Sequence, residues 1–320
     1  MKDGWFILVT LLIIGFSAVG SEKAPRPLVV RVGYFPNITH AQALVARELS
    51  RQGNGWFESR LGAEIQWFSY NAGPSAMEAF FAKSLDLTYV GPNPALNAYI
   101  RSQGKEVRIL AGATRGGAGL VVQKAIEKAA DLKGQKIATP QFGNTQDVAA
   151  RSWLEQQGFK VTLSGGDVQV VPTPNPEQLG LFKRKALVGA WTVEPWVSRL
   201  ELEAGGQLMV NESNAITTLL AVRVSFFEKN AELARKFAAA HAELTAWINT
   251  HPQEAQKLVR AALKAETKRE FGENLLRHAW PRMHFSTEVS LEAMETIVAS
   301  AQKVGYLKNA IPLKTLIVPP

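Results

Sequence analysis

The feature that most constrains this chain is a repeated order of apolar strand, short turn rich in Gly, Pro or Asn, and helix. In the first third, strands are expected over 28–34, 64–68, 85–90 and 107–113, and helices over 41–49, 76–82 and 95–102. Strands that alternate with helices in this way are typical of βα units on a largely parallel sheet. Such sheets place ligands at the carboxyl ends of the strands, beside helix N-termini. The pattern therefore predicts an α/β fold with its binding residues in the strand-to-helix turns.

The pattern starts again after the glycine-rich segment 116–119. A second set of strands is expected over 120–122, 132–140, 168–171, 186–191 and 207–210, with helices over 125–130 and 146–157. The β-branched run 217–224 is predicted as a strand that returns to the first half. From Asn230 onward the chain is expected to be helical, over 231–250, 253–264 and 290–304. Two α/β halves agree with a length of 320 residues, because a domain usually contains about 100–200.

The first residues differ in composition from the rest. Lys2 precedes an apolar run, Trp5–Phe16, and small residues follow at 17, 18, 20 and 21. A run of this length is short for a membrane span and is typical of the core of a signal peptide. We expect a signal peptide over residues 1–20, cleaved after the small-x-small segment 18–20, and export of the mature chain. The alternative is that the segment remains as an N-terminal anchor.

The absence of cysteine and the distribution of charge exclude several kinds of site and partner. The chain has no cysteine, which excludes disulfides, thiolate metal sites, a thiol nucleophile and a lipid-modified Cys after the signal. A periplasmic protein is therefore expected rather than a lipoprotein. The net charge is +8, but Lys and Arg are scattered, and the one tight group, 183–185, is too short for a nucleic-acid tract. No nucleic-acid partner is predicted, and the positive potential favours the approach of small anions.

Several segments, taken in order, resemble the nitrate, sulfonate and taurine group of ABC-transporter substrate-binding proteins. They are VGYFPNITHA (32–41), GPNPA (91–95), LKGQKIA (132–138), WTVEPW (191–196), FFEKN (226–230) and WINTHP (247–252). The resemblance covers nearly all of the mature chain. It implies a two-lobed fold like that of type II periplasmic binding proteins, each lobe a mostly parallel sheet flanked by helices.

The same resemblance implies a domain organisation and partners. Lobe one would comprise residues 28–115 and 224–320, lobe two 122–217, and the hinge strands would lie near 116–122 and 217–224. A small-molecule ligand would be captured in the cleft between the lobes by hinge closure. An ABC-transporter permease in the inner membrane would be the partner, with the chain itself a monomer in the periplasm.

The turns of the first half supply one set of candidate ligand-binding residues. These are Phe35, Pro36, Asn37, His40, Gly73, Ser75, Gly91, Asn93 and Thr114. Amide, hydroxyl and imidazole groups at helix N-termini can donate hydrogen bonds to an anion. Structural roles remain open for three of them, since Asn37 suits a turn, His40 suits an internal hydrogen bond and Ser75 suits an N-cap.

The second half supplies the other candidate wall. Its residues are Phe142, Gly143, Asn144, Thr145, Trp191, Glu194 and Trp196. The resemblance implies ligand contact for the turn 143–145, and the two Trp side chains are interpreted as pocket walls or as core. The predicted turns carry no Lys or Arg cluster, so a zwitterion with an amine near Glu78 or Glu194 stays open beside a simple anion.

A non-enzymatic binding protein is thus the leading hypothesis. No nucleophile–base pattern, His-rich metal spacing or phosphate loop occurs in the sequence, so no catalytic residue, metal or cofactor is predicted. The ligand classes that follow are small anions or zwitterions such as sulfonates, taurine or nitrate. The alternatives are an enzyme on the same fold, similar to menaquinone-pathway dehydratases, and a binder of a thiamine pyrimidine precursor.

Overall fold

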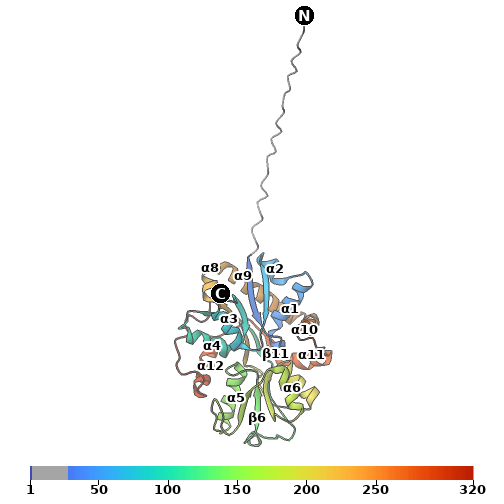
Figure 1. Cartoon of the computed structure of the whole chain (residues 1–320), viewed down its shortest axis with the longest axis vertical. Helices are drawn as coiled ribbons and strands as arrows, with labels where there is room; N and C mark the ends of the chain where they lie inside the picture. Colours follow the sequence, from blue (N-terminus) through green and yellow to red (C-terminus); the bar gives the residue numbers. More distant parts are fainter. Residues whose placement is uncertain (2–27, 320) are drawn as a thin grey trace.

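Two β-sheets, each flanked by helices, lie one above the other in the structure (Figure 1). The structure is a computed structural model that describes Met1 and residues 28–319. The expected signal peptide over residues 1–20 therefore lies, apart from Met1, outside the described residues. The α/β class predicted from the alternation of strands and helices is confirmed.

The first sheet has the strand order β11-β4-β10-β3-β1-β2. Its strands are β1 (Val29–Tyr34), β2 (Glu64–Ser69), β3 (Leu87–Val90), β4 (Val107–Gly116), β10 (Ile216–Arg223) and β11 (Met283–Phe285). The helices around it are α1 (Ala41–Arg51), α2 (Trp56–Leu61), α3 (Gly73–Phe81), α4 (Pro92–Arg101), α8 (Val224–Lys229), α9 (Ala231–Thr250), α10 (Pro252–Thr267), α11 (Glu273–Ala279) and α12 (Leu291–Lys303). A short 3₁₀ helix, η1 (Ile38–His40), leads into α1, and η3 (Trp280–Arg282) leads into β11.

The second sheet has the order β7-β6-β8-β5-β9. Its strands are β5 (Ala118–Val122), β6 (Lys136–Thr139), β7 (Gln169–Pro172), β8 (Gly189–Val193) and β9 (Gln207–Asn211). The helices beside it are α5 (Thr145–Gln156), α6 (Asn175–Lys183) and α7 (Trp196–Ala204), with the 3₁₀ helix η2 (Ala129–Leu132).

Both sheets are mixed, whereas the sequence predicted mostly parallel sheets. In the first sheet β1 pairs in parallel with β2 and β3, whereas β10 is antiparallel to β3 and β4. In the second, β6 is parallel to β7 and β8, whereas β5 is antiparallel to β8 and β9. The antiparallel strands β5 and β10 each adjoin a place where the chain passes between the sheets. Every residue of both strands is buried, so they form part of the two cores.

The two passages between the sheets lie next to each other. Gly116 and Gly117 both have positive φ, +74° and +70°, and connect β4 to β5. The Gly116 amide donates to the Ala215 carbonyl (2.8 Å) in the segment that joins β9 to β10. The segments expected to form the hinge, 116–122 and 217–224, lie mostly within strands. The chain passes from one sheet to the other at residue 117 and returns over residues 212–215. The division into two lobes with a hinge stays a prediction.

Three sequence-based expectations were wrong. The helix expected over 125–130 is a turn followed by η2, because so short a segment gains too few hydrogen bonds to offset nucleation. The region after Asn230 is not wholly helical, since β11 pairs with β4 at the edge of the first sheet. The Pro-rich segment 172–176, expected to be a loop, contains the start of α6, with Pro176 in the first turn, where proline is tolerated.

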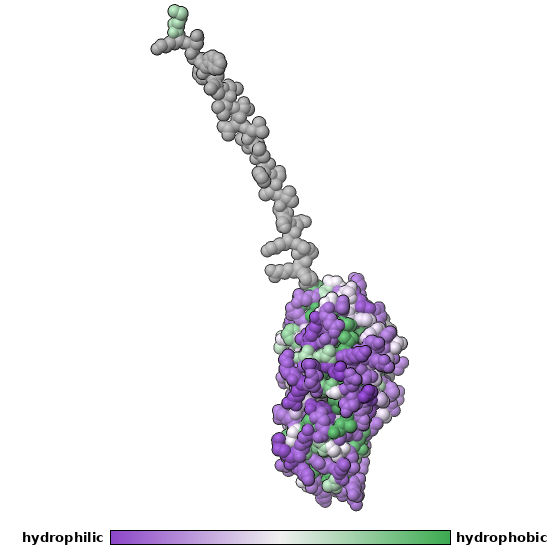
Figure 2. Space-filling model, turned by 90° about the vertical axis from the view of Figure 1, so that its right-hand side faces the viewer, coloured by the Kyte–Doolittle hydropathy of each residue, from purple (hydrophilic) through white to green (hydrophobic). Residues whose placement is uncertain are grey.

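The face of the molecule shown in Figure 2 is mainly hydrophilic, with apolar residues in smaller patches. Exposed large apolar side chains such as Leu28, Phe68 and Phe142 come from separate segments. Among the described helices, none is long and apolar enough to cross a bilayer.

A buried histidine links α9 to the first sheet. His241 is fully buried, its Nδ1 lies 3.0 Å from the Tyr89 hydroxyl and its Nε2 lies 2.8 Å from the Gly112 carbonyl oxygen. Burial lowers the pKa of His241 from 6.5 to about 4, against the opposing effect of the Gly112 hydrogen bond. The folded protein therefore holds this imidazole neutral at a pH where the unfolded chain binds a proton.

We predict that His241 contributes to acid sensitivity. Its contribution to the free energy of unfolding is fully present above about pH 6.5 and is lost at about 1.4 kcal/mol per pH unit as the pH falls toward 4. Urea denaturation at pH 7, 6 and 5 should show a smaller decline for His241→Gln than for the unsubstituted chain. His251→Gln, at an exposed position, is the control and should leave the decline unchanged. An unchanged decline in His241→Gln would contradict the prediction.

Candidate functional site

Four helix N-termini meet between the two sheets. Helix α3 begins at Gly73 and α4 at Pro92 on the first sheet, and α5 begins at Thr145 and α6 at Asn175 on the second. Each starts where a parallel strand has just ended, which is why the chain order of βα units brings them together. Unpaired amide groups and the positive ends of the helix dipoles thus point toward one region.

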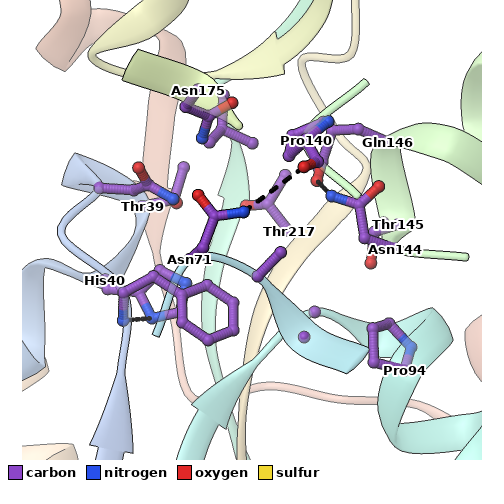
Figure 3. A pocket seen from close by; sticks show the side chains of 16 residues that line it. Thr39, His40, Asn71, Pro94, Pro140, Asn144, Thr145, Gln146, Asn175 and Thr217 are labelled. Atoms are coloured by element: carbon purple, nitrogen blue, oxygen red, sulfur yellow. Dashed lines mark hydrogen bonds between the residues drawn. The ribbon is translucent and has the colours of Figure 1, made fainter. Parts of the chain in front are cut away.

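A small pocket occupies this region. It is lined by Phe35, Asn37, Thr39, His40, Asn71, Ala72, Gly73, Gly91, Pro94, Pro140, Asn144, Thr145, Gln146, Asn175, Val193 and Thr217. Residues of the first sheet and its helices form one wall, and residues of α5, α6 and β8 form the other (Figure 3). About 20 Å³ of space remains between them, enough for roughly one water molecule. A solute of several heavy atoms therefore needs the two walls to move apart before it can enter.

Protein donors occupy the side-chain oxygens of Asn37 and Asn175, whereas Asn71 is held by its NH₂ group, which donates to the Pro140 carbonyl (3.4 Å). Asn37 Oδ1 accepts from Trp196 Nε1 (3.0 Å), and Asn175 Oδ1 accepts from the Thr192 hydroxyl (2.8 Å). The NH₂ groups of both Asn side chains have no hydrogen-bond partner among the described residues. These protein donors fix which end of each amide remains for a ligand, and in both cases it is the donating end.

The α5 wall repeats this arrangement. Asn144 Oδ1 caps the helix by accepting from the Asp147 amide (2.8 Å), while its Nδ2 donates to Gln146 Oε1 (3.2 Å). The Gln146 NH₂ group is left without a partner among the described residues. The Thr145 hydroxyl oxygen is buried and also lacks a partner within the described chain. Helix capping therefore directs further donors to the pocket.

His40 is the one ionisable residue among the lining side chains. Its Nδ1 accepts from the Phe35 amide (3.4 Å), and its ring lies 4.4 Å from that of Phe35. Burial lowers the pKa of His40 from 6.5 to about 3, so the imidazole is neutral at physiological pH. With Nδ1 accepting, Nε2 carries the proton and is a further neutral donor.

No carboxylate lines the pocket. Glu194 is fully buried nearby but accepts from the Ser198 amide and hydroxyl (3.1 and 2.8 Å) and from Arg282 (2.9 Å). Burial raises the pKa of Glu194, an effect that its hydrogen bonds with Ser198 and the charge of Arg282 oppose. Glu78 lines a separate cavity with Arg101 and Tyr306. Neither of the carboxylates considered for an amine lines the pocket. The lining is neutral and its free polar groups are mainly hydrogen-bond donors, which suits an anion.

The structure brings part of the predicted site together. The predicted residues that line the pocket are Phe35, Asn37, His40, Gly73, Gly91, Asn144 and Thr145. The predicted residues that do not line it are Pro36, Ser75, Asn93, Thr114, Phe142, Gly143, Trp191, Glu194 and Trp196.

Several of the residues outside the pocket hold its walls in place. The Trp196 indole orients Asn37, and the Thr114 hydroxyl donates to the Thr39 carbonyl (2.7 Å). The Gly143 amide donates to Asp147 (3.0 Å), whose carboxylate also pairs with Arg151. Their contribution to binding would be to position other groups.

Two more of these residues lie where the walls meet. The Ser75 hydroxyl is 3.1 Å from Gln141 Nε2, and the Phe142 ring packs edge-on against Tyr306 with centroids 5.9 Å apart. Both contacts join a residue of the first sheet's half to one of the second's. Asn93 and Trp191 instead line a different cavity behind α4 and α5.

Four polar residues that line the pocket are absent from the set predicted from the sequence: Asn71, Gln146, Asn175 and Thr217. Gln146 follows the predicted 143–145 turn directly, and Asn71 begins the turn that contains Gly73 and Ser75. Asn175 was hidden by the expectation of a loop, where the Pro-Asn-Pro order could have signalled a helix start. Thr217 sits at the start of β10, whose place in the sheet no local pattern reveals.

The fold is that of periplasmic binding proteins. The alkanesulfonate-binding protein SsuA from Xanthomonas axonopodis pv. citri, solved with bound MOPS, has a TM-score of 0.74 at 17% identity and covers 92% of this chain and 99% of its own. The nitrate-binding protein NrtA from Synechocystis PCC 6803 also has a TM-score of 0.74, at 14% identity, and covers 89% of this chain and 83% of its own.

The family follows from sequence. The model of the NMT1-like family matches residues 23–263, and the chain belongs to this family. The taurine-binding periplasmic protein of Escherichia coli (strain K12) is 27% identical over 193 residues. The matched region spans 58% of this chain and 58% of that relative. The predicted resemblance to periplasmic binding proteins of ABC importers is confirmed at the level of family and fold.

We predict that Gly91 controls how closely the two walls approach. A Cβ at this position would overlap the Thr145 hydroxyl across the pocket. Gly91→Ala should therefore hold α4 and α5 apart and populate a more open form, seen as a larger radius of gyration in small-angle X-ray scattering. Gly180→Ala is the control, because its Cβ would approach only Arg184, at 3.4 Å, on its own helix. Identical scattering from Gly91→Ala and the control would refute the prediction.

Proposed function

We propose that this chain is the extracytoplasmic solute-binding component of an ABC importer and that it captures a small oxyanion between its two halves. The observation that carries the proposal is the pocket itself. Four helix N-termini converge on the pocket, the free amide ends of Asn37, Asn175 and Gln146 are donors, and the described lining residues include no Lys, Arg, Asp or Glu. Such a site stabilises negative charge with dipoles and N–H groups rather than with a countercharge.

The absence of a lining carboxylate favours a simple anion over a zwitterion. An ammonium group placed in this pocket would meet the donors of Asn37, Asn175 and Gln146 and would lose its hydration without a paired acceptor charge. We therefore infer that an alkanesulfonate or nitrate binds more tightly than taurine.

Binding is proposed to proceed by opening and closing about the two adjacent passages. The walls contact one another at Asn71 Nδ2, which donates to the Pro140 carbonyl (3.4 Å), and at Ser75 with Gln141. On the other side the Ile38 amide donates to the Glu194 carbonyl (2.9 Å). A bound anion would add hydrogen bonds from both walls and so shift the equilibrium toward the closed form.

We also propose where the chain acts and which protein receives its ligand. The signal-like segment over residues 1–20 supports export to the periplasm. A membrane permease is proposed as the partner that receives the closed form, and the chain is proposed to act as a monomer. Ligand release to a permease requires no chemical change in the solute.

A screen of the mature chain tests the proposal directly. Thermal shift against propanesulfonate, taurine and nitrate should give the largest increase with an oxyanion that lacks an amine. A ligand present at 100 times its Kd adds about 2.7 kcal/mol to the free energy of unfolding. Mass spectrometry should recover the ligand unaltered. Chemical conversion of the ligand, or a larger shift with taurine than with the simple anions, would overturn the proposal.

Asn175 offers the sharpest variant for the same assay. Asn175→Asp keeps the oxygen that accepts from Thr192 but replaces the free donor with a second, charged oxygen. Loss of a charge-assisted hydrogen bond costs about 1.5–3 kcal/mol, so the Kd for the anion should rise about 10- to 100-fold. Asn54→Asp, an exposed position, changes the net charge equally and should leave the Kd unchanged.

The neutral state of His40 makes a prediction about pH. Because the pKa of His40 is lowered to about 3, its protonation state stays constant between pH 6 and 8. The Kd for a strong-acid anion, measured by isothermal titration calorimetry over this range, should change less than about twofold. A Kd that tightens as the pH falls from 8 to 6 would show instead that a cationic imidazole holds the anion.

A further inference from the structure

A second cavity, here called the rear cavity, lies between α5 and the helices α4 and α12. It has a volume of about 290 Å³. Its walls include Val148, Trp153, Trp191, Val210, Glu212 and Ile216. It is open to solvent and is bounded by α5, β8 and β9 on one side and by α4 and α12 on the other.

The rear cavity contains one charged side chain, Glu212. One carboxylate oxygen accepts from the Trp191 indole N–H (2.8 Å), and Trp153 packs at 5.9 Å from Trp191. No Lys, Arg or His lines the cavity, and no ion pair within the described chain includes Glu212. Burial raises the pKa of Glu212, opposed only by the hydrogen bond from Trp191. The carboxylate is thus partly removed from water without a countercharge.

The chemistry of these walls is complementary to an organic cation. A partly desolvated carboxylate gains most from a positively charged partner, and indole rings also attract cations. The aliphatic side chains of Val148, Val210 and Ile216 supply apolar surface for the substituents of such a cation. This combination is the reverse of the first pocket, which presents neutral donors and no carboxylate.

We propose that the rear cavity binds a small organic cation of the alkylammonium class, with the positive nitrogen held by Glu212 beside the indoles of Trp153 and Trp191. The alkyl part lies against the aliphatic side chains between α5 and α12. The site shares only Thr145 with the first pocket, and the proposal does not rest on the function proposed for that pocket.

Isothermal titration calorimetry of the mature chain with n-butylammonium chloride tests the proposal, with 1-butanol as the uncharged analogue. The cation should bind with a single site and 1-butanol at least tenfold more weakly. Glu212→Gln keeps an oxygen for the Trp191 indole but removes the charge, and it should weaken cation binding at least tenfold. Glu232→Gln, which removes an exposed carboxylate paired with Lys236, is the matched control and should bind as the unsubstituted chain does.

Two further variants locate the site. Thr296→Trp, at an exposed position of α12, should fill the rear cavity and abolish cation binding while Glu212 is intact. Asn175→Ala, in the anion pocket, should leave cation binding unchanged. No detectable binding of n-butylammonium, equal binding of 1-butanol, or unchanged binding in both Glu212→Gln and Thr296→Trp would each overturn the proposal.

Discussion

The chain passes between its two sheets twice, and the rest of the structure depends on the bonding of these two passages to each other. The Gly116 amide donates to Ala215, and the Thr217 hydroxyl lies 2.9 Å from the Gly116 carbonyl oxygen. A side chain at Gly116 would overlap backbone oxygens of Ser213 and Arg282, and its φ of +74° is strained for other residues. This close backbone approach fixes the axis about which the two halves face each other.

The pocket between the two sheets depends on this contact. Because β10 is inserted between β3 and β4, Thr217 at its start lies beside the end of β3, the strand that leads to α4. The second sheet is oriented so that the starts of α5 and α6 face the same space. Residues outside the pocket then decide which ends of two lining amides are free. Trp196 donates to the Asn37 oxygen and Thr192 to the Asn175 oxygen, which leaves the NH₂ groups of both Asn side chains without a partner among the described residues.

Much of the architecture could be predicted from local pattern. Strand-to-helix alternation located most of the elements, and the turns at 35–40, 73–75, 91–93 and 143–145 were selected because Gly, Pro, Asn and Ser gather there. Local pattern failed where a short element depends on distant partners. Strand β11 has three residues and exists because it pairs with β4, and α6 begins within a segment whose prolines indicate a loop.

By itself, the sequence determined the α/β class and several of the turns that line the pocket, because these depend on periodicity and on residues with strong local preferences. Tertiary structure alone decided which of those groups face the same space. Trp191 and Asn93 look like pocket residues in the sequence, yet they line the rear cavity, and Glu194 is held by Ser198 and Arg282. The direction of a buried side chain depends on partners that are distant in the sequence. Glu194 is held by Arg282, 88 residues away, and no local pattern contains that information.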